Sequence, residues 1–235
     1  MKNLFILLFI SFQCFSQDKL VVYNFKILED EKLTNNESLG KLFEKGMEEA
    51  KHLKLNLEFN DTLARFKIQE AMSIEESNTN MAIAICNCKE EKYIYDDKVY
   101  RSNSVGLFKK NEYIIIDSLN TNWTLEAESK IIDGYECYKA TSEYIVINSK
   151  GQFRHPVTAW FCPQLPYAFG PSGYGGLPGL ILELQVRNNV FYVEKIVLYH
   201  KIEEPIILPS KGKVISYDEY NNKIGELMKD RFKDE

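Results

Sequence analysis

From residue 54 onward, apolar side chains recur at every second position in one short segment after another, and this pattern constrains the fold more than any other feature. Such alternation is typical of strands with one buried face. The longest of these segments are residues 136–147, 157–161, 180–186 and 190–199. Because short turns without helical patterns join them, the sequence predicts an antiparallel sheet.

Two segments have the periodicity of a helix instead. In residues 37–53, apolar side chains recur at three- and four-residue steps, behind a capping box formed by Thr34 and Glu37. A second capping box, Ser216 with Glu219, precedes a short C-terminal helix. We therefore expect an α+β domain in which a mainly antiparallel sheet packs on the N-terminal amphipathic helix.

Length and charge exclude several classes of protein. The chain has 235 residues, of which 45% are hydrophobic, and its net charge is -5. This length suits one domain, and we find no linker or internal repeat that would divide it. The negative balance provides no basic field for nucleic acid, so we expect no nucleic-acid partner.

The first 16 residues have the layout of a secretory signal peptide. A basic start at Lys2 is followed by an apolar run of roughly a dozen residues and by small residues ahead of Gln17. That run is shorter than the roughly 20 residues of a membrane span, so we expect an exported protein that does not span the membrane, with a single domain over 17–235. The alternative is a lipoprotein signal with Cys14 lipidated, which Gln13 fits poorly.

Four cysteines remain after such cleavage, and an even number in an exported chain indicates disulfides. Cys137 and Cys162 lie at nearly equal distances from a turn near Gly151, which favours a cross-strand bond between them. Cys86 and Cys88 would then remain as free thiols, a local bridge or an intermolecular link. As thiolates they could chelate a soft cation such as Cu(I), which makes copper a possible cofactor.

The segment 176–181 reads GLPGLI, which is the signature of the GLPGLI family of exported bacterial envelope proteins. Its flanks also resemble that family: Thr158-Ala159-Trp160, then Phe169-Gly170-Pro171, and upstream the stretch 134–140. The resemblance implies a location in the periplasm or at the outer membrane, often beside TonB-dependent receptors, but it implies no established activity.

The order of strand, Gly/Pro-rich loop, strand, tight turn and strand is also similar to the later strands of periplasmic lipoprotein-localisation factors. That weaker, architectural similarity implies a curved, half-barrel-like sheet wrapped around the helix and enclosing an apolar cavity.

The Gly- and Pro-rich loop at 163–179 has two readings. It either connects two strands, with Leu177 entering the core, or forms the rim of a cavity where aromatic side chains contact a ligand or partner. In the second reading the candidate residues are Trp160, Tyr167, Phe169, Tyr174, Gly176, Leu177, Pro178 and Gly179.

No hydrolase, phosphate-binding or dinucleotide motif is present, and the three histidines are scattered. We therefore expect a non-catalytic protein that binds an apolar ligand, a peptide or an envelope partner. One alternative is copper handling by Cys86 and Cys88, for which a Met or His should join the two sulfurs. The other is an unrecognised hydrolase, for which a nucleophile–base pair should lie in a cleft.

Overall fold

The computed structural model describes residues 18–69, 79–103, 106–148 and 151–231. The signal peptide predicted for residues 1–16 lies outside the described residues, as does Cys14. The twelve strands of these residues form one sheet that does not close into a barrel. The mainly antiparallel, curved sheet expected from the alternating segments is therefore confirmed.

The first six strands belong to the N-terminal half of the chain. They are β1 (Asp18–Ile27), β2 (Lys54–Phe59), β3 (Leu63–Ile68), β4 (Lys92–Tyr95), β5 (Lys98–Ser102) and β6 (Tyr113–Ser118). The others follow in the C-terminal half. They are β7 (Thr124–Ile132), β8 (Tyr135–Asn148), β9 (Gly151–Cys162), β10 (Leu180–Val186), β11 (Asn189–His200) and β12 (Lys213–Ser216).

Five helical segments of the described residues accompany the sheet. They are α1 (Glu31–Thr34), α2 (Gly40–Ala50), α3 (Asn80–Cys86), the 3₁₀ turn η1 (Pro171–Gly173) and α4 (Tyr217–Arg231).

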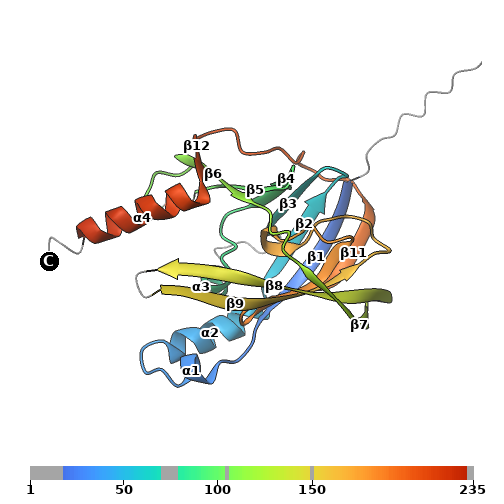
Figure 1. The fold of residues 1–235 in the computed structure, drawn as a ribbon, viewed down its shortest axis with the longest axis horizontal. Coiled ribbons are helices and arrows are strands. Elements are labelled where there is room, and N and C mark those ends of the chain that lie inside the picture. The colour runs from blue at the N-terminus through green and yellow to red at the C-terminus, as the bar shows by residue number, and fades with distance from the viewer. Residues whose placement is uncertain (1–17, 70–78, 104–105, 149–150, 232–235) are drawn as a thin grey trace, which may run out of the picture.

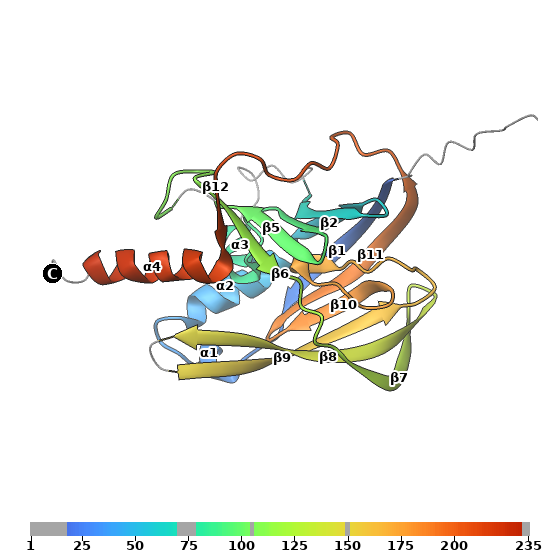
Figure 2. The same ribbon diagram turned by 45° about the horizontal axis from the view of Figure 1, so that its top comes forward.

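The strands lie in the order β12-β6-β5-β4-β3-β2-β1-β11-β10-β9-β8-β7. Neighbouring strands are antiparallel except β12 and β6, which pair in parallel. The N-terminal strand β1 therefore lies at the centre and joins the two halves of the sheet. In Figures 1 and 2 the arm with β4, β5 and β6 and the arm with β8 and β9 curve toward one another, so that the sheet has a concave side.

The N-terminal helix differs from the prediction in extent and in position. The predicted helix 37–53 is shorter, and its contacts are with α3 and β1 instead of along the concave side of the sheet. Gly46 is the contact point, since a Cβ there would lie 2.4 Å from Ile85 Cδ1 of α3. The concave side instead receives α3 and the loop that contains η1 (Figure 1).

The two predicted capping boxes had different outcomes. Ser216 and Glu219 form theirs, because the Glu219 amide donates to Ser216 Oγ at 3.2 Å and the Ser216 amide donates to Glu219 Oε2 at 3.1 Å. The box of Thr34 and Glu37 is wrong: the Thr34 hydroxyl donates to the Asp30 carbonyl at the end of a separate short helix, α1. Asp30 is the N-cap of α1, because its side chain accepts from the Lys32 amide. The capping residue of this region is therefore Asp30, and it starts α1 instead of α2.

The core lies between the arms and under the central strands. Its largest buried side chains are aromatic, with Phe25 and Phe66 both packing on Phe191. The buried Tyr23 hydroxyl donates to the Ile181 carbonyl and so links β1 to β10 across the intervening β11. No helix in the described part of the chain is long and apolar enough to cross a membrane.

Candidate functional site

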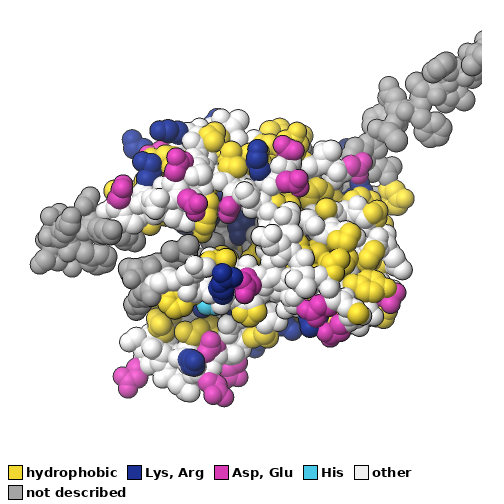
Figure 3. All heavy atoms as spheres, in the orientation of Figure 1, with side chains coloured by type: hydrophobic (Ala, Val, Ile, Leu, Met, Phe, Trp, Pro, Cys, Tyr) yellow, Lys and Arg dark blue, Asp and Glu magenta, His cyan; other side chains and the backbone are white. Residues whose placement is uncertain are grey.

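A cavity of about 510 Å³ opens on the concave side of the sheet. Strands β4, β5 and β6 line it from one arm and β8 lines it from the other. The ends of β10 and β11 with Arg187 between them, the end of α3, η1 and the start of α4 complete the walls. Figure 3 shows this face hollowed between α4 and the β8–β9 hairpin, with basic side chains visible inside. The lining combines aromatic and apolar groups with charged ones, and so differs from the purely apolar cavity that was expected.

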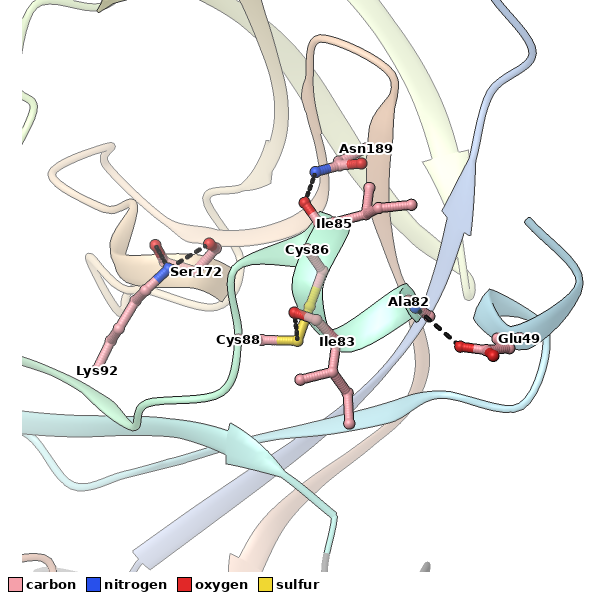
Figure 4. Close-up of a disulfide and its surroundings, with 9 residues drawn as sticks. All are labelled: Glu49, Ala82, Ile83, Ile85, Cys86, Cys88, Lys92, Ser172 and Asn189. Atoms are coloured by element: carbon pink, nitrogen blue, oxygen red, sulfur yellow. Dashed lines mark hydrogen bonds between the residues drawn. A yellow bond between two sulfur atoms is a disulfide. The ribbon is translucent and has the colours of Figure 1, made fainter. Parts of the chain in front are cut away.

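Lys92 is a buried cation in the cavity wall. It is the first residue of β4, it is only 8% exposed, and its amine donates to Ser172 Oγ at 3.0 Å and to the Ser172 carbonyl at 3.4 Å. Burial and, to a smaller degree, the positive charge of Arg101 lower the pKa of the Lys92 amine to about 8, while Glu90 opposes the shift. Figure 4 shows the amine pointing from its strand toward the loop that carries Ser172.

Arg101 supplies a second positive charge to the same wall. It lies on β5, and its guanidinium carbon is 5.3 Å from the centre of the Tyr217 ring at the start of α4. Asp117 on β6 also lines the cavity, and its pKa is raised, mainly by burial, although Arg101 acts in the opposite direction. The cavity therefore holds a permanent cation against an aromatic face, which is an arrangement that suits an anionic ligand with an apolar part.

The loop that contains Ser172 reaches the cavity in a constrained conformation. Ser172 and Gly173 both have positive φ, of 58° and 83°. A Cβ at Gly173 would lie 3.1 Å from Val99 Cγ1 and 3.5 Å from Lys92 Cδ, so the loop packs directly on the wall formed by β4 and β5. Behind it, the Gly176 amide donates to the Ala168 carbonyl at 2.9 Å, which fixes the base of the loop.

Tyr174 is the one aromatic residue among the predicted loop residues that lines the cavity. Its ring packs at 6.3 Å from that of Trp123, whose indole nitrogen donates to the Gly175 carbonyl at 2.9 Å. Burial raises the pKa of the Tyr174 hydroxyl, so the group stays neutral. Tyr174 therefore provides a fixed, uncharged aromatic wall.

The other predicted loop residues belong to the core or its border. Tyr167 and Phe169 both pack on Phe59, and Leu177 is 2% exposed. Trp160 is buried on β9 with the Lys130 amine 4.2 Å from its ring centre. Gly176, Pro178 and Gly179 form the turn into β10 and do not line the cavity.

Cys86 and Cys88 form a disulfide at the end of α3, and Cys86 lines the cavity. Of the alternatives left open by the sequence, this is the local bridge, shown in Figure 4. Because the bond uses both sulfurs, this form offers no thiolate to a soft cation. Over the described ranges, no group of three or more His, Cys, Asp or Glu side chains is placed to hold a metal ion.

Cys137 and Cys162, for which the sequence predicts a disulfide, are both buried free thiols in this structure, and their oxidative pairing stays a prediction. The predicted proximity is present: Tyr138 pairs with Phe161, so the next pair along β8 and β9 is Cys137 and Cys162. Burial, and then the neighbouring Cys162, raise the pKa of the Cys137 thiol to about 12.

Sequence reasoning missed Lys92, Arg101 and Ser172. Lys92 and Arg101 lie in short strands with charged neighbours, where they look like solvent-exposed positions. Only Ser172 carried a local signal, as a hydroxyl between a proline and a glycine in the loop already singled out. The contact between Lys92 and Ser172 joins residues 80 positions apart and depends on the curvature of the sheet.

Comparison with known proteins finds one family model that is similar to part of this region. The family model described as "Protein of unknown function (Porph_ging)" matches residues 148–183, which include β9, the loop with Ser172 and the start of β10. No curated protein matches the chain.

Two solved structures of PNGF-II, in space groups P21 and C2, have a similar fold. Their TM-scores are 0.52 and 0.53, and their sequences are 16% and 15% identical to this chain. The similarity covers 90% of this chain but only 34% and 33% of theirs, so this chain spans about a third of the length of PNGF-II. At this identity the similarity shows the fold alone.

Proposed function

We propose that this chain is an exported protein of the GLPGLI family that binds an anionic ligand with an apolar part in the concave cavity. The Porph_ging match supports the family, since residues 148–183 contain the GLPGLI segment. We infer the class of ligand from the position of Arg101, which is a permanent cation in the cavity wall beside the aromatic ring of Tyr217.

The cavity is large enough for a small amphipathic molecule. About 510 Å³ lies within the range of small-molecule sites, roughly 300–1,000 Å³. Tyr174 and Phe191 provide apolar contact on walls distinct from the strand that carries Arg101. The ligand would place its anionic group at Arg101 and its apolar part against these rings. We further propose that the protein acts in the periplasm or at the outer membrane, where a TonB-dependent receptor is the candidate partner.

The test uses two fluorescent probes that differ in charge. The first, 8-anilinonaphthalene-1-sulfonate, has a sulfonate that its uncharged analogue N-phenyl-1-naphthylamine lacks. The folded protein should bind the sulfonate more tightly than the neutral probe. Arg101→Gln should weaken binding of the sulfonate about tenfold, as expected for the loss of a charge-assisted contact, with little effect on the neutral probe.

Lys98→Gln is the matched control, because it removes one positive charge from an exposed position of the same strand outside the cavity. It should leave both affinities unchanged. Equal affinity of the wild type for the two probes, or equal loss in both variants, would contradict the proposed site. Cooperative unfolding of each variant must be checked, since the sulfonate probe also binds partly unfolded protein.

A further inference from the structure

The cavity also contains one close hydroxyl–amine contact. Lys92 Nζ lies 3.0 Å from Ser172 Oγ, and both residues line the cavity. The hydroxyl comes from the loop between β9 and β10 and the amine from β4, so the fold brings together two groups 80 residues apart. Figure 4 shows the two side chains meeting tip to tip.

The surroundings of Lys92 are unusual for a buried lysine. Buried ammonium groups are normally paired with a carboxylate. In the described part of the chain no carboxylate lies within 4.0 Å of the Lys92 amine, which donates to the Ser172 hydroxyl and carbonyl. The nearby charges are Arg101 on β5, which disfavours the protonated amine, and Glu90 ahead of β4, which favours it. Asp117 on β6 and the Tyr174 hydroxyl line the same cavity.

These surroundings make the amine available as a base. Its pKa of about 8 leaves about a tenth of the molecules with a neutral Lys92 at pH 7. A base with a pKa near the working pH is the kind that general-base catalysis needs. The geometry also suits a base, because the nitrogen already lies within hydrogen-bond distance of the hydroxyl that it would deprotonate.

The backbone at Ser172 has an uncommon conformation. Its φ of 58° lies in the left-handed region, where glycine is the residue that fits without strain. A serine in such a position presents its hydroxyl at the tip of a tight turn. Strained backbone of this kind occurs where the surrounding structure holds a functional side chain in place.

We propose that Ser172 and Lys92 form a nucleophile–base dyad that hydrolyses carboxylic esters entering the cavity. The proposal rests on the ligand site proposed above, because Arg101 would hold the anionic part of the ester while Ser172 reaches its carbonyl. Serine–lysine pairs are one of the known ways to activate a hydroxyl without histidine.

The reaction has two balanced halves. In the first, Ser172 Oγ attacks the ester carbonyl carbon and its proton passes to neutral Lys92. The tetrahedral intermediate then collapses, the bond to the alcohol oxygen breaks, and the alcohol leaves with the proton from Lys92. In the second half, a water molecule attacks the acyl–Ser172 ester and gives a proton to Lys92. Collapse releases the carboxylic acid, and the proton returns to Ser172 Oγ.

The first experiment labels the full protein with a fluorophosphonate and locates the adduct by peptide mass spectrometry. Ser172 Oγ should form a bond to phosphorus and expel fluoride. The rate should rise with pH and level off above about pH 8, because only the neutral amine acts as a base. The same pH profile should govern hydrolysis of p-nitrophenyl butyrate.

Two variants separate catalysis from folding. Ser172→Gly removes the hydroxyl and suits the positive φ, so the protein should stay folded and lose labelling and hydrolysis. Lys92→Met should slow both by at least about 100-fold, as expected for loss of a general base. Ser129→Ala, at an exposed position on β7, should behave like the wild type.

Absence of a Ser172 adduct in the folded wild type would overturn the dyad, as would an unchanged labelling rate in Lys92→Met. These failures are distinguishable from failure of the ligand site. If the sulfonate probe binds in an Arg101-dependent way but Ser172 is not labelled, only the dyad is wrong. If Ser172 is labelled but the probe does not bind, only the proposed ligand class is wrong.

Discussion

Single residues decide how the loop at 163–179 joins the sheet. Gly176 and Gly179 both have positive φ and close neighbours in the signature turn. Gly176 has a φ of 75°, and a Cβ at Gly179 would lie 2.2 Å from the Cys162 carbonyl oxygen. The connecting role of the signature turn is therefore explained by backbone packing at the start of β10.

Gly179→Ala tests this explanation. The added methyl would meet backbone atoms that cannot rotate away, so we expect the free energy of unfolding to fall by about 2 kcal/mol or more. Urea denaturation monitored by tryptophan fluorescence gives this value. The matched control is Gly225→Ala in α4, where a Cβ has no neighbour within 4 Å. It should change the stability by no more than about 1 kcal/mol, in the stabilising direction. Equal stability of the wild type and Gly179→Ala would contradict the explanation.

Burial of the Lys92 amine also predicts a pH dependence of stability. Its pKa is about 8 in the folded protein and about 10.4 in the unfolded chain, so between these values the unfolded chain binds more protons. Stability due to this group therefore rises with pH across that window, by at most about 1.4 kcal/mol per unit. Lys92→Met should lack this rise, because methionine does not titrate.

The measurement is urea denaturation of the wild type and Lys92→Met from pH 7 to 10. The difference between them isolates Lys92 from the tyrosines that titrate at the upper end. A difference that stays constant over this range would show that the amine has an ordinary pKa.

Contacts between elements explain where the helix prediction failed. The apolar pattern of residues 37–53 identified a helix, but it did not show that Asp30 would start a separate short helix or that α3 would cover the apolar face of α2. The N-cap of α3, Thr79, makes no side-chain cap. Glu49 of α2 takes over this function, because its Oε2 accepts from the Met81 amide at 2.6 Å and from the Ala82 amide at 3.1 Å.

Glu49→Ala should therefore destabilise the protein by about 1–2 kcal/mol, as expected for loss of a helix cap. Glu48→Ala is the control, because Glu48 is exposed and its ion pair with Lys51 lies at the surface. It should cost less than about 0.5 kcal/mol. Thermal unfolding followed by circular dichroism compares the two, and equal effects would contradict the capping role of Glu49.

Over the whole molecule, the sequence predicted the fold better than the site. Alternation along β8 to β11, with short turns between β8 and β9 and between β10 and β11, was enough for an antiparallel sheet, since these signals are local. The parallel pairing of β12 with β6 was not predicted, because it joins segments that no short turn connects. The cavity depends on contacts across the two arms, which is why only Tyr174 of the predicted loop residues lines it.

The most direct test of this account is a crystal structure of the protein with 8-anilinonaphthalene-1-sulfonate bound. We predict the sulfonate within hydrogen-bond distance of Arg101 and the rings against Tyr174 or Tyr217, inside the cavity between β5 and β8. A probe bound on the outer face of the sheet at saturating concentration, with no contact to Arg101, would contradict the proposed ligand site.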